Sequence, residues 1–145
     1  MDRREAVLGT GLFALAGLAG ADKASTEETP HLHHGLHHRS LADAAESCVA
    51  TGQACLEHCL DLLGGGDKEL GACAKSVMQM LPLCSALQNL ANQDSKYLVK
   101  LANAALDACQ DCAEECKKHA EKHDICKRCG ESCRACYKEC KQLAT

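Results

Sequence analysis

Large aromatic side chains are almost absent from this sequence. It contains no tryptophan, one phenylalanine (Phe13) and two tyrosines (Tyr97 and Tyr137). A folded core must therefore be built mainly from leucine, alanine, valine and cysteine. Such small side chains bury little apolar area each, so a domain of this size gains only limited hydrophobic stabilisation. A bound metal can add to that stabilisation.

Strong charge of one sign is also missing. The 145 residues carry 16 Lys and Arg against 20 Asp and Glu, a formal net charge of −4. The lysines of the last third are interleaved with acidic residues, which argues against a nucleic-acid surface. No acid–base pair or open coordination position stands out that would support catalysis, so we do not expect an enzyme.

The first residues have the features of a targeting segment. Arg3 and Arg4 form a twin arginine, and a run of small and apolar residues follows from 6 to 21. The run ends on an Ala-Gly-Ala site of the kind that signal peptidases cleave, and it is too short and glycine-rich for a comfortable membrane span. We predict a twin-arginine-type signal peptide over residues 1–21 and export to a periplasmic or membrane-associated compartment. The alternatives are the general secretory route and a buried or anchoring helix.

A histidine-rich segment follows over residues 22–39. It is polar and irregular, and a stretch of eight residues after Pro30 contains five histidines: His31, His33, His34, His37 and His38. Such a tract either binds metal or is a solvated linker. If the next helix extends backwards, His34 and His38 continue its inward stripe and would lie at the mouth of the fold.

Residues 40–145 show helical periodicity throughout. Apolar residues and cysteines recur in steps of three and four, a pattern that predicts four helices, over residues 40–63, 67–91, 95–121 and 124–143. Ser40 is expected to cap the first helix, and Pro82 is expected to kink or split the second. Amphipathic helices joined by short turns pack naturally as an antiparallel bundle. We therefore predict an all-α fold, an antiparallel four-helix bundle over residues 40–145.

Cysteine is the residue that this part of the chain has in excess. Five cysteines form the run C-x2-C-x3-C-x2-C-x3-C from Cys126 to Cys140, and this spacing puts side chains on one face of a helix. The inward stripes of the other helices also carry cysteines, so the bundle should have a cysteine-lined core. The thirteen candidate ligands are Cys48, Cys55, Cys59, Cys73, Cys84, Cys109, Cys112, Cys116, Cys126, Cys129, Cys133, Cys136 and Cys140.

An up-down-up-down topology predicts which cysteines meet. The first and third helices end where the second and fourth begin, so this end of the bundle should gather Cys59, Cys73, Cys116 and Cys126, with His119 nearby. The opposite end should gather Cys48, Cys84 and Cys140.

Disulfide bonds are one use for these cysteines. Neighbours three or four apart on a helix have Cβ atoms about 5–6 Å apart, whereas a disulfide needs about 3.5–4.5 Å. Pairs along one helix therefore cannot close without distortion, although bridges between helices remain possible. The odd total also leaves one thiol over. A disulfide-stapled structural or interaction protein of the cell envelope stays as an alternative.

Metal binding suits the spacing better. Thiolates favour Cu(I), Zn(II) and iron–sulfur clusters. Zinc needs four ligands per ion, so thirteen thiols make at most three such sites, and a zinc-thiolate buffer remains a second alternative. Cu(I) accepts two or three thiolates, so successive pairs become overlapping sites along a tube. The number of ions can then approach the number of cysteines, which indicates storage.

Other soft groups lie near these thiols. Met80 falls on the inward stripe between Cys73 and Cys84, so its thioether is a possible ligand, although a core methionine is usually only filler. His119 extends the stripe of the third helix one step past Cys116. Together with His34 and His38, these residues form a second rank of candidate metal ligands.

The cysteine pattern resembles that of the four-helix-bundle copper storage proteins. The run from Cys126 to Cys140 matches their cysteine-rich repeat, and the shorter runs at 109–116 and 48–59 fit it too. The leader is similar to that of the family's exported branch. The resemblance implies many Cu(I) ions bound by cysteine thiolates inside the bundle, a homotetramer, and histidine and methionine ligands at one open end. It also implies that the copper is held for delivery to copper enzymes, directly or through a chaperone.

Overall fold

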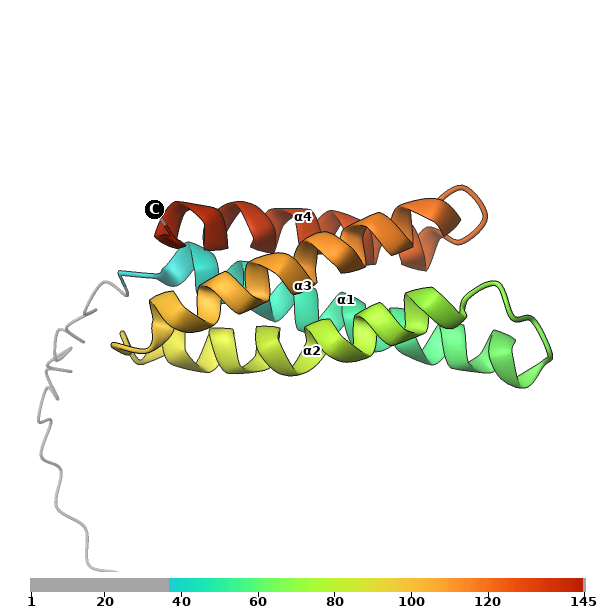
Figure 1. The fold of residues 1–145 in the computed structure, drawn as a ribbon, viewed down its shortest axis with the longest axis horizontal. Helices are drawn as coiled ribbons and strands as arrows, with labels where there is room; N and C mark the ends of the chain where they lie inside the picture. Colours follow the sequence, from blue (N-terminus) through green and yellow to red (C-terminus); the bar gives the residue numbers. More distant parts are fainter. Residues whose placement is uncertain (1–36, 145) are drawn as a thin grey trace, which may run out of the picture. The chain divides into compact units, whose positions relative to one another are not determined.

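The computed structural model describes residues 37–144, which form a bundle of four helices without a strand (Figure 1). The helices are α1 (Arg39–Gly64), α2 (Gly71–Asn92), α3 (Leu98–His119) and α4 (Asp124–Ala144). Each helix packs against two neighbours, in the order α1, α2, α3, α4 and back to α1. The prediction of an all-α antiparallel four-helix bundle is confirmed. Among the described residues, no helix combines the length and apolar character that a membrane crossing requires.

Two helices begin later than the periodicity predicts, because side chains hold the preceding residues in turns. Before α2, Gly66 has φ +95°, and the Asp67 carboxylate accepts a hydrogen bond of 2.9 Å from the backbone N–H of Glu69. Before α3, the Ser95 hydroxyl accepts a bond of 3.3 Å from the backbone N–H of Tyr97. Short polar side chains compete in this way with helical backbone bonds, and periodicity alone does not reveal it.

Two local expectations for α1 and α2 are corrected. Ser40 does not cap α1: the helix begins one residue earlier, and the Ser40 hydroxyl instead donates a 2.7 Å hydrogen bond to the Glu139 carboxylate of α4. Pro82 does not split α2, which runs unbroken for 22 residues. Pro82 is exposed while Met80 and Cys84 beside it are fully buried, so packing of the inner face maintains the helix across the missing backbone bond.

The two ends of the bundle have different interiors. We call the end where α1 and α3 finish and α2 and α4 begin the thiol end, and the other the apolar end. The apolar end is filled by buried leucine and alanine side chains: Leu41, Ala45, Leu87, Ala91, Leu98 and Ala102. Towards the middle and the thiol end, most of the buried core side chains are cysteines. The buried thiols therefore lie in the middle of the bundle and at its thiol end, apart from Cys140 near the C-terminus of α4.

Candidate metal centre

All thirteen cysteines are free thiols with fully buried side chains. They come from all four helices, with five on α4, and each lies on the inward stripe that the 3/4 spacing predicts. No disulfide is present within residues 37–144, which contain every cysteine of the chain. The interior is therefore a channel-shaped set of sulfurs enclosed by helices, as predicted for a cysteine-lined core.

Two groups of four thiols stand out along the bundle. The outer cluster, nearest the thiol end, consists of Cys55, Cys59, Cys73 and Cys126. The central cluster takes one cysteine from each helix: Cys48, Cys84, Cys109 and Cys136. In each cluster all four sulfurs lie within 4.8 Å of one another. Such spacing allows one ion to contact two or more thiolates without movement of the helices.

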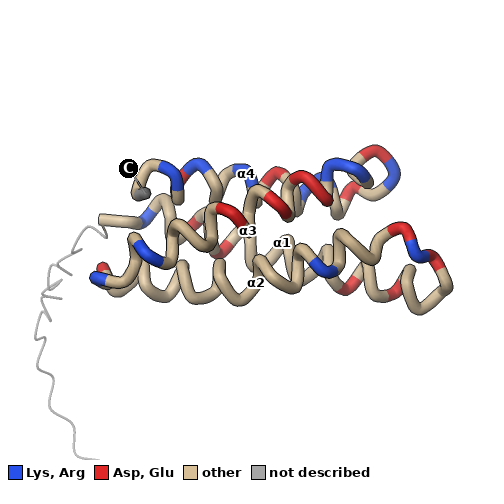
Figure 2. Tube along the Cα trace, in the orientation of Figure 1, with Lys and Arg blue, Asp and Glu red and all other residues tan. Residues whose placement is uncertain are grey.

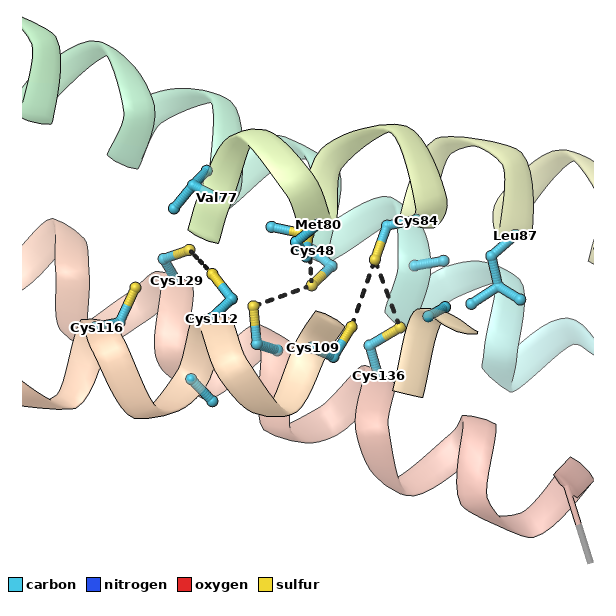
Figure 3. Close-up of a cluster of buried hydrophobic side chains, with 14 of the residues drawn as sticks. Cys48, Val77, Met80, Cys84, Leu87, Cys109, Cys112, Cys116, Cys129 and Cys136 are labelled. Carbon is cyan, nitrogen blue, oxygen red and sulfur yellow. Dashed lines mark hydrogen bonds between the residues drawn. The ribbon is translucent and has the colours of Figure 1, made fainter. Parts of the chain in front are cut away.

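The central cluster gathers the side chains of its four cysteines between the helices (Figure 3). Cys84 Sγ is 3.5 Å from Cys109 Sγ and 4.0 Å from Cys136 Sγ. Cys140, which was predicted to gather with Cys48 and Cys84, is not a member of the central cluster, where Cys109 and Cys136 join them. It lies one helical turn beyond Cys136, whose thiol it contacts. Cys48 and Cys84 are mid-helix residues, and the leucines and alanines of the apolar end lie beyond them. Cys140 belongs to none of the thiol groups found among the described residues.

Two linking groups of three thiols connect these clusters. One contains Cys55, Cys116 and Cys129, and the other Cys112, Cys129 and Cys133. Cys55 also belongs to the outer cluster, and Cys129 belongs to both linking groups. Cys133 Sγ lies 3.4 Å from Cys48 Sγ of the central cluster. We call this continuous series the sulfur path. Each group along this path shares a thiol with the next group or contacts it.

The prediction for the thiol end is largely correct. Cys59, Cys73 and Cys126 meet in the outer cluster, joined there by Cys55. Cys116 lies beside them, with its Sγ 3.6 Å from Cys73 Sγ. The topology was sufficient for this result because these residues sit within a few turns of the helix ends that meet there.

Each group of thiols contains one member whose pKa is lowered. Hydrogen bonds from neighbouring thiols, with Cys116 the largest contributor, lower the pKa of Cys55 in the outer cluster and of Cys112 in a linking group. In the central cluster, the Cys109 thiol makes the largest contribution to lowering the pKa of Cys136. A thiolate surrounded by S–H donors is stabilised in this way because hydrogen bonds to the charged form favour it.

The remaining thiols hold their protons more strongly. Burial is the largest cause that raises the pKa of Cys59 and of Cys126, followed by repulsion from the neighbouring thiolates. For Cys73 a hydrogen bond with Cys116 lowers the pKa, but the contact with Cys55 and burial outweigh it and raise the pKa to about 11. The metal-free tube is therefore mostly protonated at neutral pH, and soft metal ions must displace protons to bind.

The second-rank ligands are placed differently from one another. Met80 is fully buried in the tube, and the Cys48 thiol donates to its Sδ at 3.6 Å. His119 is partly exposed on the last turn of α3, at the thiol end. His38 precedes α1 at the apolar end, where its Nε2 lies 3.3 Å from Asp94 Oδ1. The structure therefore does not bring His38 to the thiols, and His34 lies outside the described residues.

Sequence reasoning missed a histidine pair at the thiol end. His58 Nε2 and His123 Nδ1 are 3.0 Å apart, and their rings meet edge-on with centroids 4.9 Å apart. His58 directly precedes Cys59, and His123 lies three residues before Cys126, so both flank members of the outer cluster. Their sequence positions indicate that both lie near the inward stripe, because each is within three residues of one of its cysteines. Their meeting depends on α1 and the α3–α4 turn being side by side, which no local pattern indicates.

Comparison with known proteins agrees with this geometry. Residues 35–145 match the family model described as copper storage protein. The chain belongs to the copper storage protein family. Family membership indicates a storage role. A search of curated proteins gave no match.

Solved structures of the family have the same fold. One, on copper loading to a cytosolic copper storage protein from Streptomyces lividans with five coppers, gives a TM-score of 0.64 at 26% identity, covering 74% of this chain and 93% of that one. Another, of the copper storage protein from Streptomyces lividans loaded with 10 copper equivalents, also gives 0.64 at 26% identity and covers 81% and 92%.

These similar structures correct the prediction of export, which is wrong. They describe a cytosolic copper storage protein. The motif itself was incomplete, because Glu5 and Ala6 follow the arginines in place of the large apolar residue of a twin-arginine signal. The predicted signal peptide, residues 1–21, lies outside the described residues.

Proposed function

We propose that this chain stores copper by binding many Cu(I) ions through cysteine thiolates inside the bundle. The sulfur path carries the proposal: four helices supply thiols that form a continuous series from the outer to the central cluster. Soft thiolates suit Cu(I), and overlapping groups suit an ion that needs only two or three of them. The storage domain spans residues 40–145, preceded by the histidine-rich segment 22–39, and all thirteen cysteines act as ligands.

Ions enter and leave at the thiol end in this proposal. The apolar end is packed with leucine and alanine side chains that cannot bind a metal, for example Leu87 and Leu98, both at most 1% exposed. The thiol end presents the outer cluster together with His58, His123 and the predicted ligand His119. A copper enzyme or a chaperone would collect copper there, because this end places donors near the surface beside the buried thiols.

Titration with Cu(I) tests the storage proposal directly. We expect reduced, metal-free full-length protein to remove Cu(I) from a competing chelator until uptake approaches the thirteen thiols. Helix content measured by circular dichroism should change little, because the thiols are already together before copper binds. Saturation at one or two ions would contradict storage.

Zinc is a second candidate cargo, favoured by the two four-thiol clusters. Four sulfurs within 4.8 Å of one another resemble the ligand set of a structural zinc site made of four cysteines. Zinc needs four ligands per ion, so the chain would hold at most about three ions. Adding Cu(I) to the zinc-loaded protein separates the two functions. Complete displacement of zinc would identify a copper storage protein, whereas zinc that stays bound in excess Cu(I) would identify a zinc buffer.

We propose further that the chain assembles as a homo-oligomer, a tetramer as in the family it resembles, through the outer face of α2. This helix carries a single charged residue, Lys75, and Figure 2 shows it almost free of charge while α4 is heavily charged. Met78 is 58% exposed on this face. An uncharged face packs against its own copy without repulsion between like charges.

Light scattering after gel filtration tests this surface. We expect Met78→Glu to shift the protein to smaller species, because a buried, unpaired carboxylate disfavours the contact. Leu60→Glu is the matched control: Leu60 is 52% exposed and belongs to a different helix, α1, so its replacement should leave the assembly unchanged. A monomeric parent protein, or a Met78→Glu variant of parental size, would contradict the proposal.

A further inference from the structure

One position of the thiol stripe on α1 carries no side chain. Cys48, Gly52 and Cys55 follow one another at helical spacing, so Gly52 stands where another thiol would fit the pattern. A Cβ atom at Gly52 would lie 2.7 Å from Met80 Cε and 3.0 Å from Leu81 Cδ2. A side chain at position 52 would therefore have to displace the end of the Met80 side chain, which lies against Gly52 where the stripe lacks a thiol.

Met80 places a sulfur atom inside the tube. Its side chain is fully buried, and its Sδ lies 3.6 Å from Cys48 Sγ. Figure 3 marks this contact between Met80 and Cys48 with a dashed line. The same Cys48 thiol lies 3.4 Å from Cys133 Sγ. Cys48 is therefore in contact with both a thioether and a second thiol.

This spot is the junction of the sulfur path. Cys48 belongs to the central cluster, and Cys133 belongs to the linking group with Cys112 and Cys129. Within residues 37–144, no group of mutually close thiols contains both Cys48 and Cys133, so their contact joins the two sets. Between Cys73 and Cys84, helix α2 has no cysteine, and Met80 is its one buried sulfur at this level.

We propose that Met80 is a thioether ligand that completes a Cu(I) site with the thiolates of Cys48 and Cys133. The inference rests on the proposed copper storage, and it assigns to Met80 a role beyond filling the core. A thioether is a soft donor that Cu(I) accepts. It is also neutral and has no proton to displace, so it adds a third ligand without a third negative charge in a buried position. Two protons leave when this ion binds, one from each thiol.

Selenomethionine labelling distinguishes a ligand from a filler. The chain has three methionines, Met1, Met78 and Met80. In a labelled Met78→Leu variant, selenium remains at position 80. In a labelled Met80→Leu variant it remains at position 78, on the outer face of α2 and outside the tube. Selenium K-edge absorption of the Cu(I)-loaded, full-length proteins reports copper directly bonded to selenium.

We expect a copper neighbour in the first sample and none in the second, since Met1 is common to both. A fully loaded Met78→Leu protein without a copper neighbour of selenium would overturn the proposal while leaving storage intact. A protein that takes up no more than one or two ions would overturn storage, and this site with it. The first sample retains Met80, so its result does not depend on how the Met80 variant folds.

Chelator competition gives a second readout. Met80→Leu conserves volume, so the fold should be retained, and we expect one copper equivalent to bind at least about tenfold more weakly. Gly52→Ala should weaken the same equivalent, because its methyl group would push the Met80 side chain aside. Met78→Leu is the matched control and should titrate like the parent. Identical titration curves for Met80→Leu and the parent would contradict the assignment.

Discussion

Loading this protein with Cu(I) should stabilise its fold more than any single substitution could. An ion that binds only the folded state adds about 2.7 kcal/mol for each site at a free concentration one hundred times its dissociation constant. Two such sites already add roughly 5 kcal/mol, enough to raise the Tm of a domain of this size by about 20 °C. The effect is large here because the core is made of small side chains and thirteen buried thiols, whose own hydrophobic contribution is limited.

Thermal unfolding followed by circular dichroism measures this effect at increasing copper loads. The Tm should climb with each equivalent, and a strong Cu(I) chelator should return it to the metal-free value. Two variants make a matched pair: Cys84→Ser removes a sulfur of the central cluster that contacts Cys109 and Cys136, while Cys140→Ser removes one outside every thiol group of the described residues. The Cys84→Ser variant should lose more of the copper-dependent rise in Tm than the Cys140→Ser variant. A Tm that stays constant while many equivalents bind would contradict this account.

Copper affinity should depend steeply on pH. Burial raises the pKa of Cys59 and of Cys126, and the pKa of Cys73 is about 11, so these thiols are protonated at neutral pH. Each ion bound by two such thiols releases two protons. The apparent affinity must then fall as pH falls, by up to about a hundredfold per pH unit for each ion.

Competition with a chelator at several pH values, together with proton release into a weak buffer, tests this prediction. Sites that use a thiol of lowered pKa should show a weaker dependence, because Cys55, Cys112 and Cys136 lose their protons more easily. Binding through one lowered and one raised thiol should release close to one proton. Copper binding without proton release near neutral pH would show that the tube is already ionised, contrary to the effect of burial on most of its thiols.

The repeat of cysteines at three and four residues determined the helices, the inward direction of the thiols and the soft-metal chemistry. These features follow from the sequence because helical periodicity is local: a residue's face depends only on its neighbours along the chain. The run from Cys126 to Cys140 was therefore sufficient to place one wall of the tube. The sequence pattern did not predict the turns before α2 and α3, since one side-chain hydrogen bond from Asp67 and one from Ser95 decide where those helices begin.

Only the tertiary structure decided which thiols form a group. The register of one helix against another depends on how side chains fit at the contact, and periodicity leaves that register open. Gly52 receives the Met80 side chain at the contact of α1 with α2, and at Gly130 a Cβ would lie 3.2 Å from Cys116 Cβ across the contact of α4 with α3. Such close fits place Cys109 and Cys136 beside Cys48 and Cys84, and they leave Cys140 outside this cluster, in contact with Cys136. The cysteine repeat thus determined that every helix has thiols on its inner face, and packing of the helices decided which of these thiols come into contact along the sulfur path.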